Sequence, residues 1–299
     1  LPRKSMTVLL ATTGGGKSLL KCHMAANHLM YGKNVLYITM EMAEEEIGRR
    51  IDANIMDITM DEVNEIPRDV YDKRLARYKT KTTGKLIIKE YPTGSVHSGH
   101  FRHLLNELEM KKNFKPDVIF LDYLNICASS RVRGAAAASS YNLVKSIAEE
   151  VRGLAMEYNC AVVTSSQFNR DGYGNSDVDL TNTSESMGIT HTADCILGLV
   201  TSEQLDELGQ LMLKQLKNRW GDLGYYRRFL VGIDRAKMKI YELEESAQNN
   251  VNLDEGSGGG SGKKMKSYDD DGPVFDKTDI GMRLKGKRKG QVFSDAQLT

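Results

Sequence analysis

The sequence has almost no net charge, few cysteines and no long apolar run. Its 41 basic and 40 acidic side chains give a formal charge of +1, so any nucleic-acid-binding surface would have to be local. The four cysteines are far apart in the sequence and lie among apolar residues, which argues against disulfides and zinc sites and favours reduced thiols. Without a signal peptide or an apolar run near the roughly 20 residues that span a bilayer, we expect a soluble cytoplasmic protein. Because the chain starts with Leu1 almost directly before its first apolar segment, we expect a fragment of a longer protein.

The most specific motif present is the glycine-rich loop ATTGGGKS at residues 11–18. An apolar segment at residues 6–10 precedes it and predicts a buried strand, and the residues after it predict a helix. A strand, a glycine loop, Lys-Ser and a helix form a phosphate-binding loop, in which backbone N–H groups and the helix dipole hold the phosphates. Lys17 can then reach the β- and γ-phosphates, and the Ser18 hydroxyl can ligate Mg²⁺. The predicted nucleotide-binding residues are Thr13, Gly14, Gly15, Gly16, Lys17 and Ser18. The alternative, a chance glycine turn before Lys-Ser, fits the flanking segments poorly.

Three later apolar segments each end in a polar side chain that could serve this loop. The segment at residues 34–40 is followed by Glu41, which could orient an attacking water or merely cap the next helix; the residues alone leave both roles open. The segment at 116–121 ends in Asp122, which predicts a carboxylate beside the Mg²⁺. The segment at 160–165 leads to Gln167, which could hydrogen-bond the terminal phosphate.

The rest of the chain predicts an α/β fold with a mostly parallel, doubly wound sheet and antiparallel strands near its end. Two polar stretches, 128–142 with Arg131 and Arg133 and 171–188, predict exposed loops. We expect one ATPase domain over residues 1–250, a Gly/Ser-rich linker, natural or engineered, at 251–262, and a disordered charged tail at 263–299. The basic cluster in that tail fits a solvated segment better than a nucleic-acid contact.

Five segments in order, over about residues 4–245, carry a specific resemblance to a known family. The segments are 11–18, 37–42 (YITMEM), 120–124 (FLDYL), 165–170 (SSQFNR) and 217–221 (KNRWG). Together they resemble the DnaB family of replicative helicases, most closely the versions carried by T-even-type bacteriophages. The resemblance implies a RecA-like core that forms a hexameric ring on single-stranded DNA. It further implies 5′ to 3′ movement, driven by ATP and Mg²⁺ at the boundaries between subunits.

The resemblance also implies roles for individual residues and for partners. Glu41 corresponds to the catalytic carboxylate, Gln167 to a sensor of the γ-phosphate, and Lys217 and Arg219 to cations donated in trans, with Arg219 as the arginine finger. The alternative for Arg219 is a structural cation at the end of a strand that fixes the turn through Trp220-Gly221. The family's DNA loop corresponds to residues 184–188, where Ser184 replaces an arginine. The implied DNA contacts are Arg131, Arg133, Glu185, Ser186 and Gly188. A primase, a helicase loader and other replisome proteins are the implied partners, and a phage-encoded chain would act in the bacterial host cytoplasm.

Other proteins with the same phosphate loop are alternatives. A recombination ATPase of the RecA type shares the core but forms filaments, and the Lys217-Asn218-Arg219 run favours the helicase. A small-molecule kinase would need an acceptor site and a lid, for which the sequence offers no candidate. An ATP-gated clock or scaffold protein is the remaining alternative.

Overall fold

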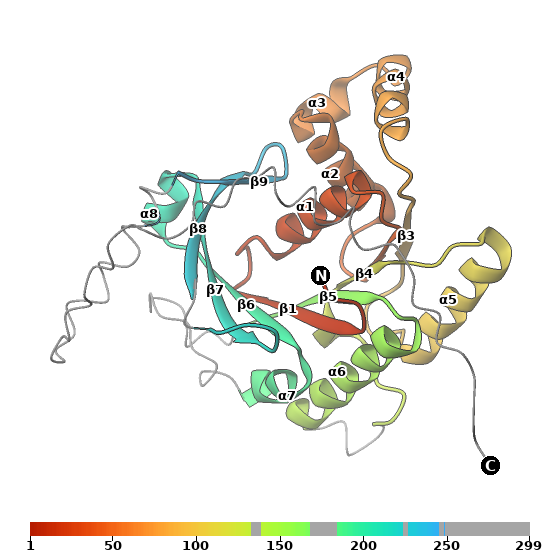
Figure 1. Cartoon of the computed structure of the whole chain (residues 1–299), viewed down its shortest axis with the longest axis vertical. Helices are drawn as coiled ribbons and strands as arrows, with labels where there is room; N and C mark the ends of the chain where they lie inside the picture. Colours follow the sequence, from red (N-terminus) through yellow and green to blue (C-terminus); the bar gives the residue numbers. More distant parts are fainter. Residues whose placement is uncertain (133–138, 168–183, 224–226, 245–247, 249–299) are drawn as a thin grey trace, which may run out of the picture. The chain divides into compact units, whose positions relative to one another are not determined.

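A nine-stranded sheet lies at the centre of the described chain (Figure 1). The computed structural model describes residues 1–132, 139–167, 184–223, 227–244 and 248, with the backbone alone at 184–187. These residues all belong to one unit, Leu1–Gly256. The linker at 251–262 and the tail at 263–299 lie outside the described residues, so their assignments stay predictions.

The strand order is β3-β2-β4-β5-β1-β6-β7-β8-β9. The six strands from β3 to β6 are parallel, and β7, β8 and β9 continue the sheet as antiparallel neighbours. This arrangement confirms the predicted fold class. The strands are β1 (Ser5–Ala11), β2 (Val35–Thr39), β3 (Leu86–Glu90), β4 (Val118–Asp122), β5 (Ala161–Gln167), β6 (Cys195–Val200), β7 (Gln210–Asn218), β8 (Arg228–Asp234) and β9 (Lys239–Glu242). The helices are α1 (Lys17–Met30), α2 (Glu44–Met56), α3 (Met60–Glu65), α4 (Arg68–Lys79), α5 (Ser98–Lys112), the 3₁₀ turn η1 (Leu124–Ile126), α6 (Ser140–Glu157), α7 (Ser184–Thr192) and α8 (Glu203–Glu207).

Both faces of the central parallel strands β1, β2, β4 and β5 are buried, which explains their continuous apolar sequences, whereas β3 at the edge of the sheet is only half-buried. Alternate residues of β2 belong to different clusters: Leu36 and Ile38 join the core beneath α5 and α6, whereas Val35 and Tyr37 join the core beneath α1 and α2. The helices accordingly lie on opposite faces of the sheet (Figure 1). In the described part of the chain, no helix is long and apolar enough to cross a membrane.

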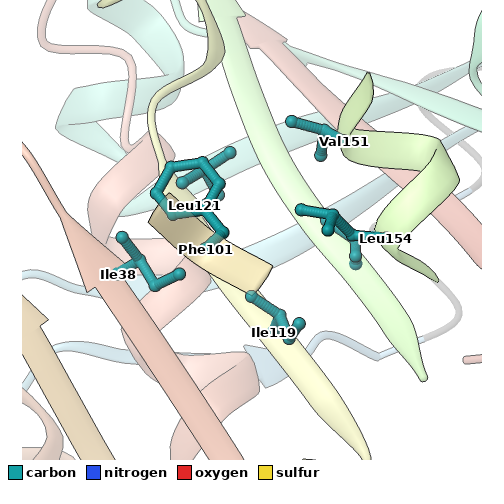
Figure 2. A pocket seen from close by; sticks show the side chains of 7 residues that line it. Ile38, Phe101, Ile119, Leu121, Val151 and Leu154 are labelled. Carbon is teal, nitrogen blue, oxygen red and sulfur yellow. The ribbon is translucent and has the colours of Figure 1, made fainter. Parts of the chain in front are cut away.

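One small cavity lies inside the core between the sheet, α5 and α6. Figure 2 shows that the side chains around it come from neighbouring strands and from both helices. Its lining is entirely apolar, so it is a packing gap rather than a substrate site. The lining residues are Ile38, Phe101, Ile119, Leu121, Val151, Leu154 and Val162.

All four cysteines are unpaired, as predicted from their spacing. Three of them, Cys22, Cys127 and Cys160, are buried, and burial raises the pKa of each thiol to about 12. Cys195 is half-buried, and burial raises its pKa to about 11. At neutral pH each side chain is therefore a thiol rather than a thiolate.

The loop predicted at residues 171–188 extends too far, because α7 already begins at Ser184. Residues 171–183 lie outside the described chain. The sequence of α7 has little amphipathic pattern, so this helix depends on packing against α6 rather than on a periodic apolar face. Gly188 permits this approach: a Cβ added there would lie 2.9 Å from the Cβ of Lys145.

A buried carboxylate in α6 fixes the segment that leads to Arg131. Glu150 accepts hydrogen bonds from the hydroxyls of Ser98 (2.6 Å), Ser129 (2.6 Å) and Ser130 (2.7 Å) and from the backbone N–H of Ser130. Burial alone would raise the pKa of Glu150, but the hydrogen bonds from Ser129, Ser98 and Ser130 outweigh it and lower the pKa to about 2.

We predict that Glu150 makes the free energy of unfolding depend on pH in acid. Its pKa is about 2 in the folded protein against an ordinary value of 4.5, so its contribution is complete above about pH 5 and is lost as the pH falls toward 2. The difference corresponds to about 3 kcal/mol. Urea unfolding of Glu150→Gln across this range should show lower stability at neutral pH and a flatter pH dependence. Glu157→Gln, an exposed carboxylate at the end of the same helix, is the control. Equal slopes for the parent and Glu150→Gln would contradict the assignment.

Candidate active site

The glycine loop joins β1 to α1 with two residues in left-handed backbone conformation. Gly14 has φ +77° and Gly16, the N-cap of α1, has φ +86°, which L side chains adopt rarely. Gly15 leaves little room for a side chain, because a Cβ there would lie 3.0 Å from the Cβ of Ala11. The loop therefore requires its glycines, and α1 directs its first N–H groups toward the space above the loop.

Lys17, the first residue of α1, curls back over the loop. Its Nζ donates to the carbonyl oxygens of Ala11 (3.1 Å) and Thr12 (2.7 Å). Partial burial and the nearby charge of Lys21 lower the pKa of Lys17, whereas the charges of Glu41 and Asp122 raise it. The ammonium thus lies where a phosphate bound to the loop would meet it.

Asp122, the last residue of β4, is buried and has several partners. Its Oδ2 accepts hydrogen bonds from the hydroxyls of Ser18 (3.0 Å) and Tyr37 (3.2 Å). Its Oδ1 forms an ion pair with Lys21, whose Nζ also donates to the hydroxyl of Ser165 (2.8 Å). The structure therefore brings Ser18 and Asp122, the two predicted Mg²⁺-side residues, into direct contact.

Sequence reasoning missed Lys21, a fully buried residue one helical turn after Lys17. Burial lowers the pKa of Lys21, and the charge and hydrogen bond of Asp122 oppose that change. One signal in the sequence could have identified it: Lys21 stands among the buried residues Leu19, Leu20 and Cys22 at the i+4 position from Lys17. A lysine on the buried face of a helix needs a carboxylate partner, and Asp122 was the candidate.

The donors beside the loop suit Mg²⁺. A hydroxyl and a carboxylate are hard oxygen ligands, and Mg²⁺ typically takes only one or two protein ligands together with phosphates and waters. Ser18 and Asp122 meet this description. Among the described residues, no cluster of three or more His, Cys, Asp or Glu side chains could hold another metal.

Glu41 and Gln167 lie at the same edge of the sheet as the loop, the edge formed by the carboxyl ends of the parallel strands. Gln167 is the last residue of β5 and pairs in register with Ala11 of β1, so it stands beside the start of the loop. Glu41 follows β2, which pairs with β4, and its charge acts on Lys17, Lys21 and Tyr123. Both side chains are exposed.

Glu41 does not cap the following helix. The N-cap of α2 is Ala43, which makes no capping hydrogen bond through its side chain, and α2 begins at Glu44. The hydroxyl of Thr39 instead fixes the turn by accepting from the backbone N–H of Met42 (3.1 Å) and donating to its carbonyl (2.8 Å). The capping alternative is therefore wrong, and the carboxylate is available on the loop side of the sheet.

Lys217 and Arg219 lie away from the loop, toward the opposite edge of the sheet. They stand at the end of β7, which runs antiparallel to β6: Lys217 pairs with Ile196, which is level with Val8 of β1, and the backbone N–H of Arg219 donates to Asp194, which is level with Met6. A strand rises about 3.3 Å per residue, so along the strands Lys217 lies about 10 Å and Arg219 about 16 Å from Ala11, where the loop starts. The structure thus brings Glu41, Asp122 and Gln167 to the loop, but it does not bring Lys217 or Arg219 there.

The predicted DNA contacts are only partly described. Arg131 is exposed and pairs with Glu149 of α6 at 3.3 Å. Gly188 lies in α7 against α6, the backbones of Glu185 and Ser186 form the first turn of α7, and Arg133 lies outside the described residues.

We predict that Lys21→Met strongly destabilises the fold, because it leaves Asp122 buried without its ion partner. Removal of one member of a buried pair costs about 3–5 kcal/mol. The double variant Lys21→Met/Asp122→Leu should recover much of this loss in urea unfolding. Lys111→Met, which removes an exposed lysine paired with Glu107, is the matched control and should change stability by less than about 1 kcal/mol. A Lys21→Met protein as stable as the parent would refute the ion pair's importance.

Comparisons with known proteins agree with this geometry. Residues 1–230 match the family model described as DnaB-like helicase C terminal domain. A protein of Enterobacteria phage T4 described as a DnaB-like replicative helicase is 42% identical over 246 residues, which cover 81% of this chain and 52% of that protein. The chain thus spans about half the length of this relative.

Two solved structures share the fold at low sequence identity. One, described as an ATPase domain, superposes with a TM-score of 0.67 at 17% identity, covering 82% of this chain and 86% of that chain. The other, a DnaB-like replicative helicase described with its interactions with primase, has a TM-score of 0.67 at 18% identity and covers 81% and 58%. Because the family match extends over most of the chain and over the whole parallel sheet, the chain belongs to the family of DnaB-like helicase C-terminal domains.

Proposed function

We propose that this chain is the ATP-hydrolysing motor of a replicative DNA helicase. The observation that carries the proposal is the division of the site between two edges of the sheet. The phosphate loop, Asp122, Glu41 and Gln167 share one edge, whereas Lys217 and Arg219 lie about 10 and 16 Å away along the strands, toward the other. A site divided in this way is complete only where the loop edge of one subunit meets the opposite edge of another, as in a hexameric ring.

The residues at the loop edge would bind ATP and prepare its hydrolysis. Backbone N–H groups of residues 13–18 and the Lys17 ammonium would hold the phosphates, and Ser18 with Asp122 would hold Mg²⁺, which neutralises charge on the β- and γ-phosphates. Glu41 would accept a proton from the water that attacks the γ-phosphorus, while the bond to the β-phosphate oxygen breaks to give ADP and phosphate. Gln167, beside the loop, would hydrogen-bond the γ-phosphate.

The residues at the opposite edge would act on the neighbouring subunit. Arg219 would place its guanidinium against the charge that develops on the transferred phosphoryl group, and Lys217 would add a second cation. Hydrolysis would then require an assembled ring, because an isolated subunit lacks half of its site.

DNA would bind as a single strand through contacts that do not depend on its sequence, with movement 5′ to 3′. The proposed contacts are Arg131, Arg133, Glu185, Ser186 and Gly188. Phosphate contacts of this kind give affinity without base specificity. A primase, a helicase loader and other replisome proteins are the proposed partners, and the bacterial host cytoplasm is the proposed location.

Mixed rings test the divided site directly. Glu41→Gln should lower kcat by about two to four orders of magnitude, and Arg219→Ala by about three to five, while both variants still bind ATP. When the two variants exchange subunits, hydrolysis should return, because some boundaries then combine an intact Glu41 with an intact Arg219. The measurement is steady-state phosphate release by the assembled protein, before and after subunit exchange.

Arg235→Ala is the matched control for Arg219→Ala. Its side chain is 48% exposed, as is that of Arg219, and it also pairs with a carboxylate, that of Asp206. We expect Arg235→Ala to keep parent-like turnover. Absence of any recovery in rings shown to exchange subunits would contradict the trans role of Arg219.

We also predict that Arg131→Ala weakens binding of single-stranded DNA. Loss of one phosphate contact should reduce the slope of log K against log salt by about 0.7, with nucleotide binding unchanged. Fluorescence anisotropy with a labelled oligonucleotide over a range of salt concentrations measures both quantities. Lys73→Ala, an exposed lysine of α4 that pairs with Asp69, is the control. An unchanged slope would remove Arg131 from the DNA path.

A further inference from the structure

Asp194 connects α7 to the end of β7 and is nearly inaccessible to solvent. It lies between Thr192, the end of α7, and Cys195, the start of β6. Its carboxylate is 4% exposed and accepts from Arg219 Nη1 at 2.7 Å, from Arg152 Nη2 at 3.0 Å and Nε at 3.1 Å, and from the backbone N–H of Met6 at 3.0 Å. One buried carboxylate thus binds two guanidinium groups from different elements.

Backbone and side-chain contacts reinforce this connection. The N–H of Arg219 donates to the carbonyl of Asp194 (3.0 Å), and the N–H of Asp194 donates to the carbonyl of Met6 (2.9 Å). Lys217 Nζ donates to the carbonyl of Thr190 in the last turn of α7 (2.6 Å). Both Lys217 and Arg219 are therefore held by the segment formed by the end of α7 and Asp194.

Without the Asp194 carboxylate, the three cations Lys217, Arg219 and Arg152 would repel one another. Burial and the like charges of Arg219 and Arg152 lower the pKa of Lys217, whereas the charge of Asp194 opposes this effect. Asp194 therefore allows three cations to lie together. The Arg219 side chain remains 48% exposed, so the contact fixes one end of the guanidinium while the group stays accessible from outside.

We propose that Asp194 is a positioning residue that holds Arg219 in the orientation required by a neighbouring subunit. The proposal rests on the trans role of Arg219 proposed above. An arginine whose side chain is already ordered loses less conformational freedom when it contacts the phosphates. A misplacement of about 1 Å of a group that acts on the reacting atoms lowers turnover by up to about 100-fold. Asp194 touches no nucleotide in this arrangement and acts only through Arg219.

Asp194→Asn tests the proposal, because it removes the charge and keeps the size of the side chain. We expect kcat to fall by about 10- to 100-fold. Because the loop of the same chain lies at the other edge of the sheet, the dissociation constant for ATP should stay within about twofold of the parent value. Mixing with Glu41→Gln subunits should restore hydrolysis, as for Arg219→Ala, because the Glu41→Gln subunits supply a correctly held Arg219.

Arg152→Gln separates positioning from a general loss of stability. It removes both hydrogen bonds of Arg152 to Asp194 but leaves the contact between Asp194 and Arg219. We expect a lower Tm with kcat within about threefold of the parent. If Asp194→Asn does not fold, Asp194→Glu takes its place in the test, because it keeps the charge but moves the carboxylate by one methylene. Asp194→Glu should give the same fall in kcat and the same recovery in mixed rings.

Each outcome decides between the two proposals. A normal kcat for folded Asp194→Asn, or an equal loss of kcat in Arg152→Gln, overturns the positioning role, and so does a failure of recovery in rings where Arg219→Ala recovers. A normal kcat for Arg219→Ala instead overturns the trans role on which this inference rests. Low kcat in both Arg219→Ala and Asp194→Asn, with recovery of both in mixed rings, supports the two proposals together.

Discussion

The buried ion pair between Lys21 and Asp122 is the interaction on which the loop edge of the sheet depends. Through it α1 is bound to β4, and the same two side chains contact Tyr37 of β2 and Ser165 of β5. Two buried charges are costly to desolvate, so such a pair does not by itself imply a more stable fold. Its effect here is to fix the relative positions of four elements, and therefore the distance between the loop and the carboxylate that would hold Mg²⁺.

The sheet keeps the two functional edges apart. Its parallel strands run from the edge that carries Asp194 to the edge that carries the phosphate loop, and side chains from both faces pack closely around them. Close-packed interiors deform little. The distance between Asp194 and the phosphate loop is therefore fixed by the packed strands between them.

Local patterns in the sequence predicted much of this arrangement, and tertiary contacts decided the rest. Residues 11–18 and Asp122 were predictable, because glycine geometry and a buried apolar run constrain each of them locally, and their contact follows from the order of the strands. The phosphate loop's buried neighbour Lys21 was not predicted, because a single lysine in a helix usually lies in solvent and its carboxylate partner is far away in the sequence. Asp194 and Glu150 were missed for the same reason: each depends on side chains from several separate segments. The first turn of α7 was predicted as loop because packing on α6, rather than periodicity, makes it helical.

The three buried thiols and the half-buried Cys195 make this chain suitable for site-specific labelling. Maleimide and iodoacetamide dyes react with exposed thiolates, and the raised pKa values of Cys22, Cys127, Cys160 and Cys195 keep all four side chains protonated at neutral pH. A cysteine introduced at an exposed position, such as Met110 in α5, would ionise in the ordinary range and react first. Fluorophores could thus be placed at chosen positions of the chain without first replacing the native cysteines, and distances between such positions could be followed by energy transfer.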